Sequence, residues 1–238
     1  MKKSILSSGI LILIAIGVVY GIFFSHSEQV TEHTEQTVRL KQPDYFEGVI
    51  TFEDTYTSSD PAVDVEAIKI QYGTKSEFYI KNGNYKQIYN GSILKSVLFI
   101  KNYNRSYIHS SITDTLFYVD CTESNESIVS TEASNNKESV LGRNCSILQI
   151  KANDLLDKEF RKSTYYFDES IAINPEWFEN SHFGSYDKLY AITKSIPIKT
   201  IHEMENYTVT SVAVSIKKQS IDSTFFDLPH GVVTERRR

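Results

Sequence analysis

The feature that most constrains the fold is a run of short strand-like segments, from Val38 onward, with turn signals about every 8–12 residues. Segment 45–54 has Phe46, Val49 and Phe52 around a glycine, 115–121 is predicted as another strand, and 145–152 alternates apolar with polar side chains, the period of a strand with one buried face. The chain is also rich in Tyr (15) and Phe (13) and poor in Gly (10) and Pro (5), a composition that favours strands. The pattern predicts a mainly β protein with a large antiparallel sheet of roughly ten strands.

Local signals add detail to this sheet. The pairs Asn82-Gly83 and Asn90-Gly91 lie between alternating segments, and Asn-Gly favours the type I′ turn of a β-hairpin. Segment 63–73 also alternates, with a change of phase at Ala67-Ile68. That segment is therefore predicted as a strand with a bulge.

Helical signals are few. The best is 174–183, where Asn174 suits an N-cap and Pro175 suits the first helical position. Segments 152–162 and 185–192 each have the length and composition for a turn or two of helix. We expect one or two short helices beside the sheet.

The N-terminus predicts export. Lys2 and Lys3 precede residues 5–24, an uncharged and mostly apolar run long enough to span a bilayer as a helix. An uncleaved anchor and a cleaved signal peptide both remain open. We expect a cell-envelope protein on the periplasmic side, tethered to the inner membrane by this segment, or released into the periplasm if the segment is cut.

Four regions follow from these patterns. The sequence divides into a membrane anchor or signal peptide, a polar linker, a single antiparallel β domain, and a polar tail ending in three arginines, at residues 1–27, 28–37, 38–229 and 230–238.

The chain has two cysteines, Cys121 and Cys145. Outside the cytoplasm two cysteines more often pair than not, so a disulfide between them is expected. Two buried free thiols, or a reactive nucleophile, are the alternatives that remain open.

Several function classes lack support in the sequence. The net charge of −5 has both signs spread along the chain, whereas a nucleic-acid binder would carry a basic stripe. No G-x-S-x-G, H-E-x-x-H or phosphate-binding loop motif is present, and none of the six His has a second His or Cys at metal-ligand spacing. We expect no enzymatic activity, no metal and no cofactor.

The stretch "VLGRNCSILQI" resembles the signature of an envelope domain family of unknown function, which includes proteins named for a Gly-Leu-Pro-Gly-Leu-Ile motif. The matching positions are Leu141, Gly142 and Cys145. That family is similar to the lipoprotein-carrier (LolA/LolB-like) superfamily. The order of pieces agrees over most of 45–229, although the Gly-Leu-Pro-Gly-Leu-Ile motif itself is missing.

The resemblance implies a sheet curled into a half-barrel, with helices on its concave face. In the carriers that concavity shields lipid acyl chains. Trp177, Phe178 and Phe183 would then plug the concavity, or else form plain core between helix and sheet.

Two functions from different classes follow. The first is a non-enzymatic binder or carrier of an apolar ligand, such as a lipid or lipidated protein, in the half-barrel. The alternative is an extracytoplasmic scaffold or protein-interaction module whose partner the sequence does not identify.

Overall fold

A computed structural model describes residues 44–155, 158–229 and 233–236. The chain divides into two compact units at residues 42 and 43, and the described residues belong to the second unit. The predicted anchor and linker lie outside the described residues. Within the described part, no helix is long and apolar enough to cross a membrane.

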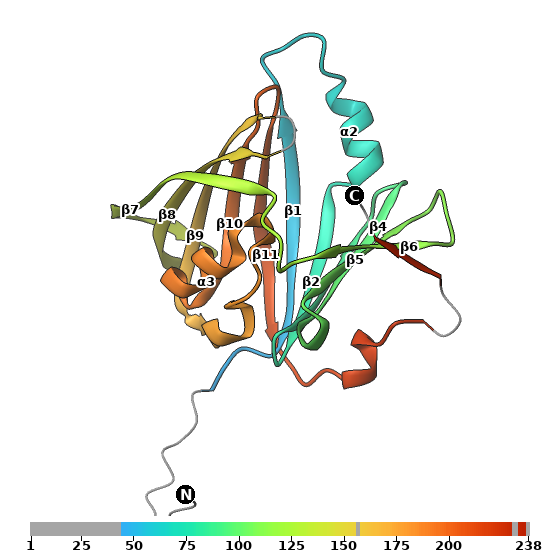
Figure 1. Ribbon diagram of the computed structural model, residues 1–238. Helices are drawn as coiled ribbons and strands as arrows, with labels where there is room; N and C mark the ends of the chain where they lie inside the picture. The colour runs from blue at the N-terminus through green and yellow to red at the C-terminus, as the bar shows by residue number, and fades with distance from the viewer. Residues whose placement is uncertain (1–43, 156–157, 230–232, 237–238) are drawn as a thin grey trace, which may run out of the picture. The chain divides into compact units, whose positions relative to one another are not determined.

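The second unit is built on one twelve-stranded sheet, which confirms the predicted fold class (Figure 1). Its strands are β1 (Gly48–Thr57), β2 (Lys75–Lys81), β3 (Asn84–Tyr89), β4 (Leu94–Ile100), β5 (Arg105–Ser110), β6 (Leu116–Asp120), β7 (Glu126–Val140), β8 (Arg143–Asp154), β9 (Phe160–Ala172), β10 (Ser195–Glu203), β11 (Thr208–Lys218) and β12 (Thr234–Arg236). All neighbouring pairs are antiparallel except β12 with β6. Strand β12 lies within residues 230–238, which the sequence predicted as a polar tail.

The strand order is β12-β6-β5-β4-β3-β2-β1-β11-β10-β9-β8-β7. Strands β1 to β6 form one meander, and β7 to β11 form a second. The two meanders meet where β1 pairs with β11, in a register that runs from Gly48 opposite Lys218 to Thr57 opposite Thr208. Strand β1, the first strand of the described chain, is thus paired with β11, the last long one. The curl of the sheet into a half-barrel stays a prediction.

Both predicted hairpins are present. Asn82 (φ 50°) and Gly83 (φ 85°) form a two-residue turn between β2 and β3, and two positive φ angles are what a type I′ turn requires. The Asn90 connection between β3 and β4 is longer. There the Asn90 side-chain oxygen accepts hydrogen bonds from the backbone N–H of Thr74 and Lys75, at 2.9 Å each.

The strand predicted at 63–73 is wrong, because Val65–Tyr72 forms helix α2. The Asp64 carboxylate accepts a hydrogen bond from Ala67 N–H at 2.9 Å and caps the helix. None of its residues is buried. Packing against the core therefore did not favour a strand here, and the N-cap stabilises the helix instead.

The other helix predictions have mixed outcomes. Helix α3 (Tyr186–Thr193) confirms the turn expected at 185–192. Asn174 caps as predicted, accepting from Glu176 N–H at 3.0 Å, but only the short 3₁₀ helix η2 (Pro175–Phe178) follows it. The helix expected at 152–162 is wrong, since β8 and β9 occupy both ends of that segment. The remaining 3₁₀ helices are η1 (Lys101–Tyr103), η3 (Phe183–Ser185) and η4 (Ser223–Phe226).

The predicted disulfide is also wrong, because Cys121 and Cys145 are both free and buried. Cys121 lies between β6 and β7, five residues before Glu126 at the start of β7, whereas Cys145 of β8 is opposite Glu138, near the end of β7. A strand rises about 3.3 Å per residue, so the length of β7 separates the two cysteines by far more than the roughly 7 Å between Cα atoms that a disulfide allows. Each thiol instead packs into the core.

The main core covers one face of the sheet, and a smaller apolar cluster forms apart from it around Leu98, Tyr107, Ile221 and Phe226. Figure 1 shows α3 lying across strands of the β9–β11 side, and its buried residues Leu189 and Tyr190 join the same apolar cluster as Ile50, Ile80 and Ile198. Burial of this apolar area, at about 25 cal/mol per Å², is the main stabilising term of the fold.

Candidate functional site

A cavity of about 510 Å³ opens between the core face of the sheet and the segment η3–α3. Alternate residues of β1 supply one wall, with Phe52, Asp54 and Tyr56 facing in while Glu53 and Thr55 are exposed. The lining is rich in aromatic residues and includes seven tyrosines, Tyr56, Tyr72, Tyr89, Tyr165, Tyr186, Tyr190 and Tyr207. Such a lining offers both ring faces and hydroxyl groups to a ligand.

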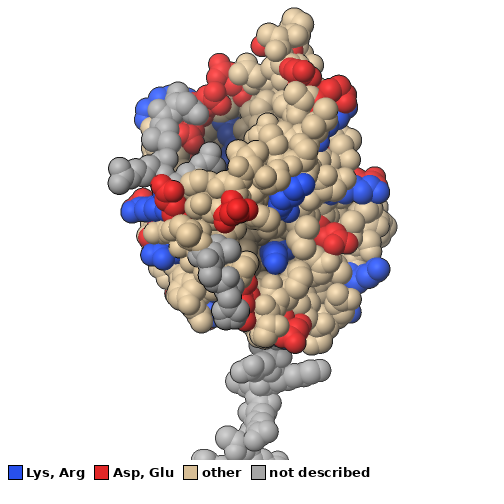
Figure 2. All heavy atoms as spheres, turned by 90° about the vertical axis from the view of Figure 1, so that its right-hand side faces the viewer, with Lys and Arg blue, Asp and Glu red and all other residues tan. Residues whose placement is uncertain are grey.

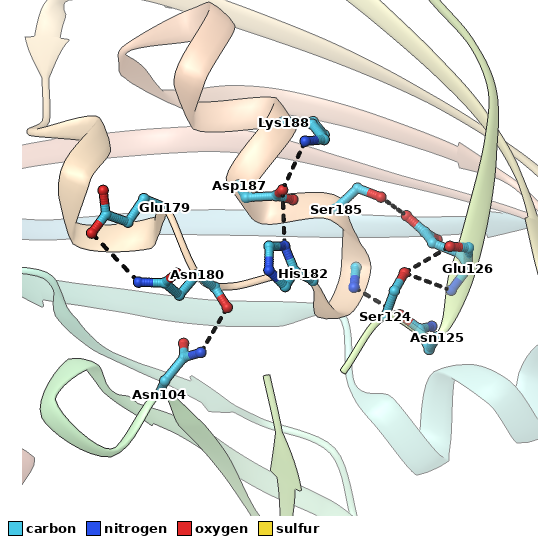
Figure 3. A network of polar contacts seen from close by, with 11 residues as sticks. Asn104, Ser124, Asn125, Glu126, Glu179, Asn180, His182, Ser185, Asp187 and Lys188 are labelled. Atoms are coloured by element: carbon cyan, nitrogen blue, oxygen red, sulfur yellow. Dashed lines mark hydrogen bonds and ion pairs between the residues drawn. The ribbon is translucent and has the colours of Figure 1, made fainter. Parts of the chain in front are cut away.

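A polar network fixes the wall formed by η3 (Figure 3). The Asn125 side-chain oxygen accepts from Gly184 N–H at 2.8 Å, and Ser185 Oγ donates to Glu126 Oε1 at 2.5 Å. Glu126 also forms an ion pair with Arg161 of β9, and its own side chain is only 3% exposed. The start of β7 therefore holds η3 in place and neutralises the charge of Arg161 inside the molecule.

His202 of β10 also lines the cavity. Its Nδ1 is 2.9 Å from Ser163 Oγ, and its ring meets Tyr165 edge-on at 5.8 Å. Burial, and after it the positive charge of Arg161, together lower the pKa of His202 to about 4. At neutral pH this side chain is an uncharged imidazole that can exchange hydrogen bonds with a ligand.

Asp54 is the lining carboxylate that sequence reasoning missed. It is 8% exposed and lies opposite Ser211 in the sheet. Burial raises the pKa of Asp54, partly offset by a hydrogen bond from Ser211. A signal for it was available: in "FEDTYT" the aspartate is in phase with Phe52 and Tyr56, so it had to share their buried face.

A second polar group, His182 with Asp187, lies outside the cavity lining. The Nδ1 atom of His182 is 3.0 Å from Asp187 Oδ2, which also pairs with Lys188 at 3.2 Å (Figure 3). The backbone N–H of His182 donates to the Cys121 carbonyl at 2.7 Å, whereas the Cys121 thiol contacts Ser106 Oγ and the Val119 carbonyl. Burial raises the pKa of Cys121, which disfavours a nucleophilic thiolate.

The three predicted plug residues lie in different surroundings. Phe183 lines the cavity. Phe178 is 1% exposed and stacks on Phe99 at 5.6 Å, so it is core. Trp177 packs edge-on against Tyr45 at 5.2 Å and does not line the cavity. The plug role therefore stays a prediction for Phe183 alone.

The signature residues serve local structure. Leu141 (φ 50°) and Gly142 (φ 71°) form the two-residue turn of the β7–β8 hairpin, with Val140 opposite Arg143. Cys145 is fully buried two residues into β8. None of the three lines the cavity, and no group of three metal-ligating side chains occurs among the described residues.

A comparison with protein-family models finds no match, and neither does one with curated proteins.

Proposed function

We propose that the β domain binds a small apolar ligand in the cavity beneath α3, without chemical turnover. The observation that carries the proposal is the cavity itself. Its volume of about 510 Å³ falls within the roughly 300–1,000 Å³ typical of small-molecule sites. The resemblance to lipoprotein carriers points in the same direction.

The lining supports this kind of ligand. Ten of the lining residues are aromatic, and Leu94, Leu189, Ile196 and Val209 add aliphatic surface. Covering apolar surface with a ligand contributes about 25 cal/mol of favourable free energy per Å² removed from water. The charged pair Arg161–Glu126 is already neutralised, so an apolar body can lie beside it without leaving a buried charge unpaired.

Two valines of β11 provide a matched test. Val209 lines the cavity, whereas Val214 is 42% exposed and lies outside the lining. Val209→Trp would fill the cavity, and Val214→Trp adds the same ring to the surface. Binding of an apolar naphthylamine dye, followed by fluorescence, should weaken about tenfold in the first variant and hold in the second.

Equal binding by both variants, with both folded by circular dichroism, would place the dye elsewhere and refute the proposal. Mass spectrometry of compounds that co-purify with the wild-type domain identifies the natural ligand. The same compounds should be depleted from Val209→Trp.

The interaction-module alternative stays a prediction. The element on which it rests is β7, a 15-residue strand that pairs only with β8 and lies at one edge of the sheet. An unpaired strand edge can accept a strand from another protein.

A further inference from the structure

We propose that the ligand of this cavity carries an organic ammonium group, which Asp54 and a surrounding set of tyrosines bind. The inference rests on the proposed function and specifies its ligand class. It starts from Asp54, the one carboxylate among the described residues that line the cavity.

Asp54 lacks a cationic partner inside the domain. Its neighbour Glu53 pairs with Lys75 on the other face of β1, Nζ to Oε1 at 3.3 Å. Arg161, the other charged lining residue, pairs with Glu126. Among the described residues no ion pair reaches Asp54, and Ser211 is its hydrogen-bond partner. A buried carboxylate without a counter-charge is costly, and a cationic ligand would remove that cost.

Four tyrosines from separate segments share the cavity lining with this carboxylate: Tyr56 of β1, Tyr72 of α2, Tyr89 of β3 and Tyr207 before β11. All four line the cavity with Asp54. Burial raises the pKa of Tyr56 to about 12, with added contributions from Asp54, Tyr207 and Tyr72. Burial, Tyr186 and Asp54 likewise raise the pKa of Tyr89. These mutual effects place the rings and the carboxylate within electrostatic range of one another.

A carboxylate among aromatic rings selects an organic cation. Aromatic faces attract ammonium groups through the ring quadrupole, and sets of such rings bind quaternary ammonium ligands. A metal ion would instead need several oxygen ligands around it, and the part of the lining that the structure describes has a single carboxylate.

The rest of the cavity gives the ligand an apolar body. Beyond Asp54 the lining continues over Phe52, Phe78, Leu189 and Ile196, which suits an alkyl chain. Arg161 is already paired with Glu126, so Asp54 is the lining charge left to compensate and the ammonium group belongs beside it. The ligand class is an alkylammonium compound, either free or as the head group of a zwitterionic lipid.

Four probes with the same octyl chain test the inference by isothermal calorimetry: octyltrimethylammonium, octylphosphocholine, octanol and octanoate. Octyltrimethylammonium should bind wild-type protein about tenfold more tightly than octanol, and octanoate more weakly than both. Comparable binding of octylphosphocholine indicates a zwitterionic head group as the natural source, and weaker binding indicates a simple alkylammonium ion. Either outcome supports the ammonium site.

Two pairs of variants locate the site. Asp54→Asn should lose about tenfold in affinity for octyltrimethylammonium and little for octanol. Glu53→Gln removes the same charge from the opposite face of β1 and should change neither. Tyr72→Phe keeps the ring and should retain affinity, whereas Tyr72→Leu should lose about fivefold. The Tyr72 pair keeps the test valid if Asp54→Asn does not fold.

Octanol binding as tightly as octyltrimethylammonium, with no loss in Asp54→Asn or Tyr72→Leu, would overturn the ammonium inference and leave the apolar-ligand proposal standing. No binding of any octyl probe would refute the apolar-ligand proposal itself.

Discussion

At the scale of single residues, His202 illustrates how the cavity changes chemistry. Its pKa falls from an ordinary value of about 6.5 to about 4, because burial and the charge of Arg161 disfavour the imidazolium ion. Between those two pH values the unfolded chain binds a proton that the folded chain does not. Folding stability therefore rises with pH through this window and is lost as pH falls from 6.5 toward 4.

The substitution His202→Gln should remove that part of the pH dependence. We expect the free energy of unfolding of the wild type to drop about 2 kcal/mol more than that of the variant between pH 6.5 and pH 4. Urea titrations at several pH values measure it, and His109→Gln, at an exposed position of β5, is the control. If the unfolding free energies of wild type and His202→Gln changed equally with pH, the lowered pKa of His202 would be contradicted.

The two cysteines give a prediction about accessibility. Cys121 is 1% exposed and Cys145 is 0% exposed, and burial raises the pKa of each thiol. In native protein we expect a thiol reagent to label neither cysteine during a short exposure. In unreduced protein denatured with guanidinium, both should be labelled at once, as mass spectrometry would show.

A reduced sample is the control for complete labelling. If the unreduced, denatured sample takes no label while the reduced sample takes two, the cysteines form the disulfide that the structure lacks.

At the scale of elements, turns with positive φ are where the sequence signal is strongest. Gly83 (φ 85°) and Gly142 (φ 71°) have the same conformation but different surroundings. A Cβ atom at Gly83 would lie 2.8 Å from Trp177 Cβ, whereas one at Gly142 would meet no atom within 4 Å. The two glycines thus separate backbone strain from steric contact.

We expect Gly142→Ala to cost about 1 kcal/mol from the positive φ alone. Gly83→Ala should cost about 2–4 kcal/mol, since the clash with Trp177 adds to the same strain. Thermal and urea unfolding of the two variants measure the difference. Equal losses would show that Trp177 moves aside without cost.

The elements also show what the sequence can and cannot indicate. Strands such as β6, β8 and β9 and the Asn82-Gly83 hairpin are predictable because their signals lie within a few residues. Segment 63–73 misled because its apolar residues alternate, yet the Asp64 cap made it helical and left it unburied. The cavity draws on residues from 52 to 211, so no local pattern marks it, and the carboxylate of Asp54 stands out only once its strand phase is known.

At the scale of the whole molecule, the surface carries charges of both signs. On the face shown in Figure 2, Lys and Arg are interspersed with Asp and Glu, without an area of one sign. Ion pairs such as Lys218–Asp44, Lys162–Glu203 and Arg236–Glu123 accompany this mixture. Exposed pairs of this kind contribute little stability each.

The pairing of β1 with β11 has a consequence for how the chain is made. During synthesis each hairpin of β1 to β6 can form as soon as its second strand emerges, because its partners are adjacent in sequence. One side of β1 must wait until residues 208–218 exist, since its partner there is β11. Closing so long a loop is slow, and until it closes, the incomplete sheet has an unpaired backbone edge along β1, beside Phe52 and Tyr56.

A chain that ends at residue 207 should therefore aggregate on refolding, which light scattering would detect. A chain that ends at residue 229, which lacks only β12 and its flanks, should stay monomeric. We therefore expect that the pairing of β11 with β1 is the step that protects the newly made chain from aggregation.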